Sequence, residues 1–121
     1  GEATVTFFGG MDEELYDDIR KSQSLKICNA ETTLRRDYVN GCESSPVAFL
    51  EGIFVIPEFR RVGVAKRLLE AVERWGQSKG CIELASDAEI DNIVSHQMHH
   101  SLGFKETERV IYFKKTLGNV E

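Results

Sequence analysis

The chain lacks any apolar run long enough to cross a bilayer, and no signal peptide opens it. It also lacks internal repeats, low-complexity tracts and linkers rich in proline or glycine. We therefore expect no membrane partner and a single domain, residues 1–121, that is large enough to bury its own core.

Cysteine is scarce, and positive charge is outnumbered by negative charge. Cys28, Cys42 and Cys81 are odd in number and form neither a CxxC pair nor a metal-ligand pattern. We expect reduced, structural thiols in a cytoplasmic protein. Lys and Arg number 15 against 20 Asp and Glu, a net charge of −5. This balance argues against a nucleic-acid partner and leaves a cationic substrate open.

Hydrophobic periodicity and turn residues predict alternating strands and helices. The strands are expected at 3–8, 25–38 (one strand or two), 47–56, 82–85 and 107–113, and the helices at 12–21, 64–79 and 92–102. This order predicts the α/β class, with a mixed central sheet flanked by helices. The nearly continuous apolar run 47–56 is typical of a strand covered on both faces. Asp91 or Asn92 is expected to cap the last helix.

The six residues from Arg60 to Ala65 join this central strand to the amphipathic helix. The start of a helix favours anions, yet Arg60 and Arg61 stand there, beside a glycine at position 63 that lets the backbone approach a ligand closely. Free N–H groups, cations and a glycine together suit a pyrophosphate. The alternative is a solvated basic turn with a glycine at the bend.

The stretch Arg60-x-x-Gly63-x-Ala65 matches the Gln/Arg-x-x-Gly-x-Gly/Ala acetyl-CoA signature of the GCN5-related N-acetyltransferases (GNAT). A second motif follows that superfamily's Asn-x-x-Ala-x-x-x-Tyr-x-x-x-Gly-Phe pattern, with serine for alanine and histidine for tyrosine. Its residues are Asn92, Ser95, His99, Gly103 and Phe104. The resemblance implies the GNAT fold, acetyl-CoA as cosubstrate, and an acetyl-CoA-binding core over residues 47–121.

Further blocks resemble the bacterial aminoglycoside 6′-N-acetyltransferases. They are Asp37–Gly41, Ser45-Pro46, Phe49–Gly52, Glu83–Asp87 and Leu102–Glu108. The resemblance implies direct acetylation of the 6′-amine of these antibiotics without an acyl-enzyme, resistance to them, and a homodimer paired through the last strand. Residues 1–24 do not resemble the family's longer N-terminal part, so a shorter strand–helix unit replaces it or the chain is incomplete there.

The resemblance also implies how the chain holds acetyl-CoA. Backbone N–H groups of residues 61–66 cradle the pyrophosphate, arginine and lysine side chains add charge, and pantetheine pairs with the backbone of 53–55, whose side chains belong to the core. The expected cofactor-binding residues are Ile53, Phe54, Val55, Arg60, Arg61, Val62, Gly63, Val64, Ala65, Lys66 and Asn92.

Three residues are candidates for the acceptor site. Glu51 is a carboxylate within an apolar run, which is costly to bury without a cause, and it is a candidate base for the substrate ammonium. An ion pair with Arg35, Arg36 or another strand residue is the alternative. Asp87 ends a strand, where ligands gather, although Asp is also a common cap or turn residue. By resemblance Tyr38 lines the acceptor site; otherwise it is an ordinary strand aromatic.

His99 stands where many superfamily members have the tyrosine that protonates the leaving thiolate, so it is a candidate acid; a partly buried structural histidine is the alternative. His96, His99 and His100 share one helix face, but no carboxylate completes a known zinc motif, and we expect no metal. An acidic pocket of Glu51 and Asp87, with Glu106 or Glu108, suits a polycationic sugar.

Two other functions stay open. One is acetylation of another small amine or of a protein amino group. The other is a catalytically inactive acetyl-CoA-binding module that keeps the cradle without an acceptor wall.

Overall fold

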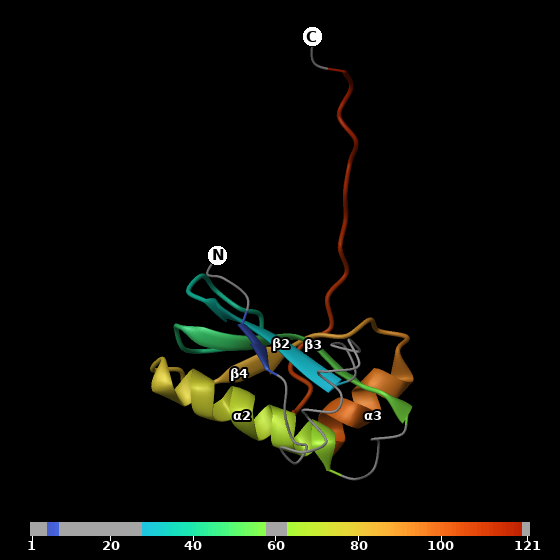
Figure 1. The fold of residues 1–121 in the computed structure, drawn as a ribbon. Coiled ribbons are helices and arrows are strands. Elements are labelled where there is room, and N and C mark those ends of the chain that lie inside the picture. The colour runs from blue at the N-terminus through green and yellow to red at the C-terminus, as the bar shows by residue number, and fades with distance from the viewer. Residues whose placement is uncertain (1–4, 8–27, 58–62, 120–121) are drawn as a thin grey trace.

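The structure, a computed structural model, describes residues 5–7, 28–57 and 63–119 (Figure 1). Its elements in chain order are β1 (Val5–Phe7), β2 (Cys28–Arg35), β3 (Val47–Val55), α2 (Val64–Ser78), β4 (Leu84–Ser86) and α3 (Ile93–Ser101). The four strands form one sheet in the order β1-β2-β3-β4. β1 and β2, and β2 and β3, are antiparallel, whereas β3 and β4 are parallel. The predicted α/β class with a mixed sheet is confirmed.

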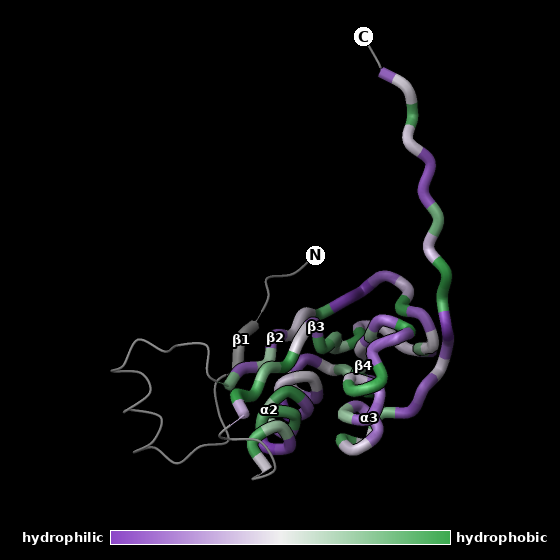
Figure 2. Tube along the Cα trace, turned by 90° about the vertical axis from the view of Figure 1, so that its right-hand side faces the viewer, coloured by the Kyte–Doolittle hydropathy of each residue, from purple (hydrophilic) through white to green (hydrophobic). Residues whose placement is uncertain are grey.

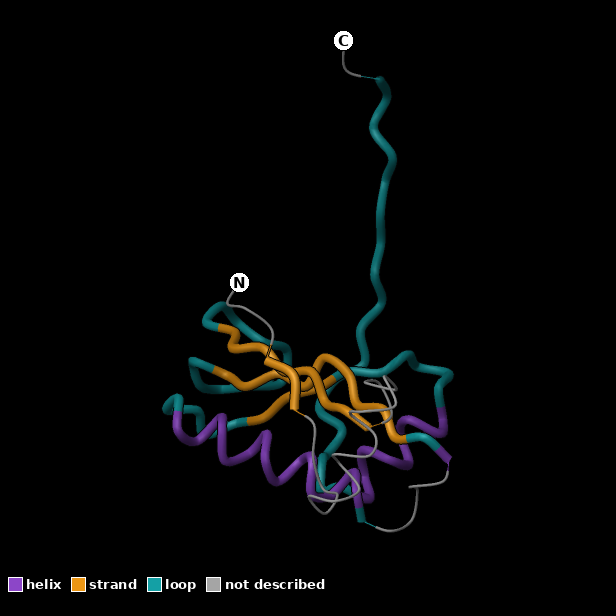
Figure 3. Tube along the Cα trace, in the orientation of Figure 1, coloured by secondary structure: helices purple, strands orange, loops and turns teal. Residues whose placement is uncertain are grey.

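Both described helices lie against one face of the sheet (Figure 3). The core between α2 and the sheet includes Leu68, Val72, Ala30 and Leu50, each at most 2% exposed. The periodicity of α2 explains this packing, because residues three and four apart share one face of a helix. Figure 2 shows this apolar side of α2 turned to the strands.

Neither described helix has the length and apolar character needed to cross a membrane.

A close contact at Gly76 fixes the C-terminal half of α2 against β3. A Cβ added at Gly76 would lie 3.1 Å from the Cβ of Ala48, tighter than ordinary van der Waals contact. Gly76 is itself buried. The pair of small residues therefore lets the helix approach the strand more closely than bulkier side chains would allow.

Most predicted elements appear with slightly different bounds. The strands predicted at 3–8, 25–38, 47–56 and 82–85 correspond to β1, β2, β3 and β4, and the helix predicted at 64–79 is α2. Asn92, rather than Asp91, caps α3, since its side-chain oxygen accepts a hydrogen bond from the Ser95 N–H at 3.1 Å. The helix predicted at 12–21 lies outside the described residues.

The strand predicted at 107–113 is wrong for this structure. Residues 104–119 form no helix or strand, and the tail extends away from the sheet (Figures 1 and 3). The alternating pattern is present, but a strand needs a neighbour to pair with, and this segment has none among the described parts of the chain. Ile111, Tyr112 and Phe113 are consequently 76%, 83% and 90% exposed.

The expectation that the strand at 47–56 is covered on both faces is correct only for its first half. Val47, Ala48, Phe49 and Leu50 are buried, whereas the residues from Glu51 onward are exposed or half-buried. The change coincides with the point at which β3 loses its parallel neighbour β4.

Candidate functional site

The candidate site lies where β3 and β4 separate. The two strands pair only through Ala48–Leu84, Phe49–Ala85 and Leu50–Ser86. β4 then ends, while β3 continues to Val55. We call this point of separation the fork. Beyond it, the β3 edge that faced β4 no longer has that neighbour, so an extended ligand can pair with it as an added strand.

A β-bulge lies at the fork, at Glu51. Thr32 pairs with Leu50 and Glu31 pairs with Gly52, so Glu51 is the extra residue on β3. The bulge shifts the alternation of β3 by one, and Ile53 then packs against the same core as Leu50. Glu51 instead occupies the sheet face opposite α2, with Thr33 and Arg35.

The Glu51 carboxylate is held by two side chains of β2. Its Oε1 accepts hydrogen bonds from Thr33 Oγ1 at 2.6 Å and from Arg35 Nη2 at 2.8 Å. The Arg35 guanidinium also lies over the Phe49 ring, 3.5 Å from its centre. Partial burial pushes the pKa of Glu51 up, but both hydrogen bonds and the Arg35 charge outweigh it and hold that pKa below its ordinary value.

The surroundings of Glu51 differ from those expected of a carboxylate within an apolar run. Its side chain is 33% exposed, so it is not a carboxylate forced into an apolar interior. The ion pair with Arg35, considered from the sequence as the alternative to a base, is present. Both roles remain compatible, because only Oε1 is engaged with the described residues and the other carboxylate oxygen is left for a ligand.

Asp87 follows Ser86, the last residue of β4, and Ser86 pairs with Leu50. Since side chains alternate along a strand, Asp87 and Glu51 each follow a residue of the helix-facing pair and belong to the opposite face. Asp87 is exposed. The sheet register therefore brings these two predicted carboxylates to the same side of the fork.

His99 lies on the helix side of the fork, with both ring nitrogens engaged. Its Nε2 is 2.8 Å from Ser86 Oγ, and its Nδ1 is 2.7 Å from the Ser95 carbonyl oxygen. Ser86 Oγ is also 3.1 Å from the Leu50 carbonyl oxygen. The edge of the Phe104 ring packs on the imidazole, with ring centres 5.1 Å apart. His96 has a separate contact with the Glu89 carbonyl oxygen.

The start of α2 has free backbone N–H groups, the feature on which the predicted diphosphate site depends. Gly63 precedes the helix with φ of 85°, and apart from its chain neighbours no described residue has a heavy atom within 4 Å of a Cβ added there. Within residues 63–119 no side chain caps this end, and no acidic residue stands in the first turn. The N–H groups of Val64, Ala65 and Lys66 have no acceptor within the helix, since the first ladder bond runs from Arg67 N to Gly63 O. The predicted cofactor residues Arg60, Arg61 and Val62 lie outside the described residues.

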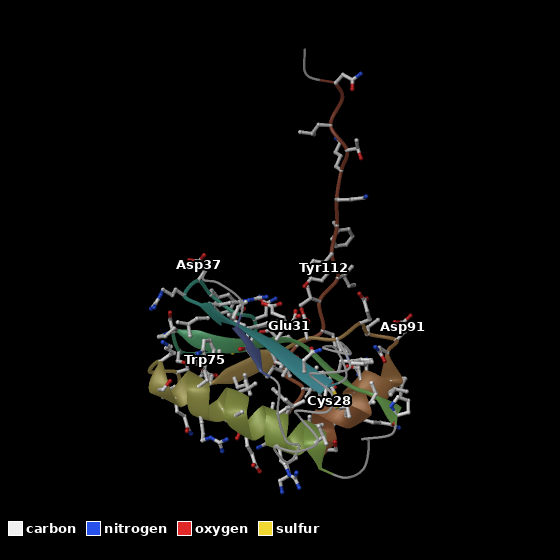
Figure 4. The ribbon with its side chains drawn as sticks, in the orientation of Figure 1. Cys28, Glu31, Asp37, Trp75, Asp91 and Tyr112 are labelled. Atoms are coloured by element: carbon white, nitrogen blue, oxygen red, sulfur yellow. The ribbon has the colours of Figure 1, made fainter. Side chains whose placement is uncertain are left out.

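Among the described residues, no hydrogen bond or ion pair joins Tyr38 or the tail acids to Glu51 or Asp87. Tyr38 lies in the loop after β2 and is 76% exposed, next to Val39, which packs with Val47 and Phe49. Figure 4 shows the neighbouring Asp37 at the opposite end of the sheet from Cys28. Glu106 pairs with Arg109 within the tail, where Glu108 is exposed. The roles of Tyr38, Glu106 and Glu108 stay predictions.

Two residues at the fork, Thr33 and Ser86, had no role in the sequence-based hypothesis. Thr33 is two positions before Arg35 on the same strand face, a signal available only once β2 is known to pair with β3. Ser86 contacts His99 from a different element, and sequence spacing does not reveal that contact. Burial raises the pKa of the Cys28 and Cys42 thiols, so neither is an activated nucleophile.

Comparison with known proteins adds independent information. Residues 29–104, more than half of the chain, match the model of the acetyltransferase (GNAT) family. A curated relative from Salmonella typhimurium, aminoglycoside N(6′)-acetyltransferase type 1, is 56% identical over 97 residues, covering 80% of this chain and 67% of the relative. The protein of the same name from Acinetobacter baumannii is 58% identical over 92 residues, covering 76% and 63%. The chain thus spans about two thirds of the length of these relatives.

Two solved structures resemble the fold. Aminoglycoside N-acetyltransferase AAC(6′)-Iy in complex with CoA has a TM-score of 0.71 at 58% identity, covering 75% of this chain and 60% of that one. AAC(6′)-Iy in complex with the bisubstrate analogue CoA-S-monomethyl-acetylneamine also has a TM-score of 0.71, at 46% identity, covering 90% and 83%. The predicted family resemblance and fold are confirmed.

Arg35→Met tests the electrostatics of Glu51. Methionine keeps an apolar stem over Phe49 but removes the charge and the hydrogen bond, so the pKa of Glu51 should rise toward its ordinary value. The Arg35–Glu51 ion pair stabilises the fold at pH values above the pKa of Glu51 in the unfolded chain. This contribution to the free energy of unfolding is lost as the pH falls through the lowered pKa of Glu51 in the folded chain. The free energy of unfolding of Arg35→Met should lose this part of its dependence on acidic pH.

Carboxylate ¹³C NMR titration measures the shift directly. Arg109→Met is the matched control, because Arg109 pairs with Glu106 in the tail. An unchanged Glu51 pKa in Arg35→Met would contradict the assignment.

Proposed function

This chain belongs to the acetyltransferase (GNAT) family, and we propose that it transfers the acetyl group of acetyl-CoA to the 6′-amine of aminoglycoside antibiotics, conferring resistance to them. The transfer is direct, from thioester to amine, with no acyl-enzyme. The raised pKa values of the Cys28 and Cys42 thiols agree with such a route. The whole chain, residues 1–121, acts as a single acetyltransferase domain.

The fork is the observation that carries this proposal. β3 continues past β4 toward Gly63 and the uncapped start of α2, so one path leads from an open strand edge to an anion site. A thioester carrier with an amide-rich arm and a diphosphate can pair its amides with the strand edge and place its diphosphate at the start of the helix. Pantetheine is held by the backbone of Ile53, Phe54 and Val55.

The diphosphate is held by the start of α2. The proposed contacts are Gly63, Val64, Ala65 and Lys66, together with Arg60, Arg61 and Val62, which lie outside the described residues. Asn92, the cap of α3, completes the proposed contacts with acetyl-CoA.

Glu51 and Asp87 bind and activate the amine. Their position on one face of the sheet suits a polycationic sugar, because two carboxylates attract and orient ammonium groups. The lowered pKa of Glu51 keeps it ionised at neutral pH, able to accept the substrate proton directly or through water. His99, on the other side of the fork, supplies the proton for the departing thiolate. Tyr38 lines the acceptor site by family resemblance.

The tail supports a homodimer. Ile111, Tyr112, Phe113 and Leu117 are all at least 76% exposed, an arrangement that is unfavourable for isolated apolar side chains in water. β4 is an edge strand of the described sheet, and edge strands readily pair with another chain. A second copy is therefore the proposed partner of residues 107–113. Three free cysteines fit a reducing compartment, so the proposed site of action is the cytoplasm.

The chemical class of the acceptor is tested with a matched pair of antibiotics. Neomycin and paromomycin differ in bearing an amine or a hydroxyl at the 6′ position. The chain should release thiol from acetyl-CoA with neomycin and not with paromomycin, because only the amine is a sufficient nucleophile for direct transfer. Thiol release is followed with a chromogenic disulfide.

Other outcomes separate the alternatives. Equal rates with both antibiotics would overturn 6′ selectivity, and activity on simple amines or peptides alone would indicate a different acceptor. Stabilisation by acetyl-CoA without turnover of any amine would indicate an inactive binding module.

Gly63→Val tests the diphosphate cradle. A branched side chain at φ of 85° is strained, and its bulk would occupy the space before the free N–H groups of α2. Calorimetry should show acetyl-CoA affinity lowered by at least about tenfold, the loss of one charge-assisted hydrogen bond. Gly80→Val is the matched control: Gly80 has φ of 83°, equally open space, and follows the other end of the same helix. Equal affinities in the two variants would refute the cradle.

Ile111→Pro tests the dimer. Proline removes a backbone N–H and fixes φ, so it should prevent residues 107–113 from pairing as a strand. Sedimentation velocity should show a dimer for the unmodified chain and a monomer for this variant. Thr116→Pro, past the predicted strand, should leave the dimer intact. A monomeric unmodified chain would refute the proposal.

A further inference from the structure

The contacts of His99 decide which of its nitrogens carries a proton. The Ser95 carbonyl oxygen has no hydrogen to give, so at 2.7 Å the His99 Nδ1 must be the donor. In the neutral ring, Nε2 is then an acceptor facing Ser86 Oγ at 2.8 Å. Ser95 and the ring edge of Phe104 hold the imidazole in this orientation.

The Ser86 hydroxyl has one hydrogen and two neighbouring acceptors. When His99 is neutral, that hydrogen points to Nε2, and the Leu50 carbonyl oxygen at 3.1 Å receives none from Ser86. When His99 is protonated, Nε2–H donates to Ser86 Oγ and the hydroxyl is free to point to Leu50 O. In this second state, the contacts of Nδ1 with Ser95 O, of Nε2 with Ser86 Oγ and of Ser86 Oγ with Leu50 O each have one donor and one acceptor. Protonation of His99 therefore releases the Ser86 hydroxyl hydrogen from Nε2, so that it can point to the Leu50 carbonyl oxygen or to another acceptor at the fork.

This arrangement leaves His99 without a ring nitrogen directed at a substrate. Ser95 engages Nδ1 and Ser86 engages Nε2. Ser86, in contrast, is the last residue of β4 and pairs with Leu50, the last residue of β3 before the bulge. Its hydroxyl contacts both the imidazole and the carbonyl oxygen of Leu50, the residue at which the two strands stop pairing.

We infer that Ser86 is the proton relay of the reaction, passing a proton from His99 Nε2 to the thiolate that departs as the amide forms. The inference rests on the proposed function, in which the diphosphate lies at the start of α2. The arm bound along β3 then runs from Val55 back toward Leu50, which brings its sulfur end to the fork.

The proton transfer balances without a further reactant. The Ser86 O–H bond breaks as its hydrogen moves to sulfur, forming the S–H bond of free CoA. The Nε2–H bond of protonated His99 breaks as that hydrogen moves to Ser86 Oγ. The relay leaves a neutral serine and a neutral imidazole with Nδ1–H still bonded to Ser95. Solvent restores the proton on His99 before the next turnover.

Ser86→Ala, with Ser86→Thr as the conservative variant, tests the relay. Loss of the hydroxyl should lower kcat for thiol release on the order of 100-fold, the lower range for one positioned proton donor, with the KM for acetyl-CoA unchanged. Threonine keeps a hydroxyl and should restore most of kcat. Ser101→Ala is the matched control, since Ser101 Oγ on α3 donates to the Met98 carbonyl and lies outside the relay.

Combining the substitutions distinguishes a relay from two separate contributions. His99→Gln should lower kcat by a similar factor. In a relay, the double variant Ser86→Ala, His99→Gln should be no slower than the slower single variant, because either substitution interrupts the same proton path. Additive losses would overturn the relay, as would full activity in Ser86→Ala.

A readout without turnover tests the geometry itself. ¹⁵N NMR of the imidazole should identify the Nδ1–H form of neutral His99, and the Nε2 signal should move in Ser86→Ala but not in Ser101→Ala. An Nε2–H tautomer in the unmodified chain would overturn the relay whatever the activity. An unmodified chain that acetylates no amine would overturn the proposed function and the relay together, whereas an active chain insensitive to Ser86→Ala would overturn the relay alone.

Discussion

The separation of β3 from β4 is the constraint on which the rest of the site depends. Three residue pairs hold the strands together, and the extra residue Glu51 then interrupts the alternation of β3. A regular strand would place Ile53 on the same face as Glu51; the bulge instead returns Ile53 to the core, while Glu51 keeps the face opposite α2. This local irregularity keeps the hydrophobic face intact, next to the strand edge that is left open where β4 ends.

The two faces of the sheet acquire different chemistry around this point. On the face opposite α2, Thr33 and Arg35 hold Glu51 in its charged form, and Asp87 belongs to the same face. On the helix face, Ser86 and His99 form a chain of hydrogen-bonding groups against a core of aliphatic side chains. In the proposed reaction, the groups that accept and donate protons therefore lie on opposite faces of a single sheet, where β3 and β4 separate.

The sequence predicted the features that depend on residues close to one another along the chain. The spacing of Val64, Leu68 and Val72 located α2, and Asn92 marked the start of α3 through its own cap. The bulge at Glu51 depends on how β2 aligns with β3, which no local pattern records. The contact of Ser86 with His99 joins two elements whose packing is tertiary. The tail shows that a local pattern alone does not make a strand. Residues 107–113 have the alternation of a strand, but they stay irregular because no described strand pairs with them.

The close contact between Gly76 and Ala48 has an evolutionary consequence. With 3.1 Å between the Ala48 Cβ and a Cβ built at position 76, a side chain gained at position 76 requires a loss of bulk at position 48, or the helix must move away from the strand. Ala48 is two residues before Leu50, so a displaced helix would also disturb the start of the fork. Homologous sequences should therefore show compensating side-chain volumes at these two sites, and drift at one position should be tolerated only alongside drift at the other.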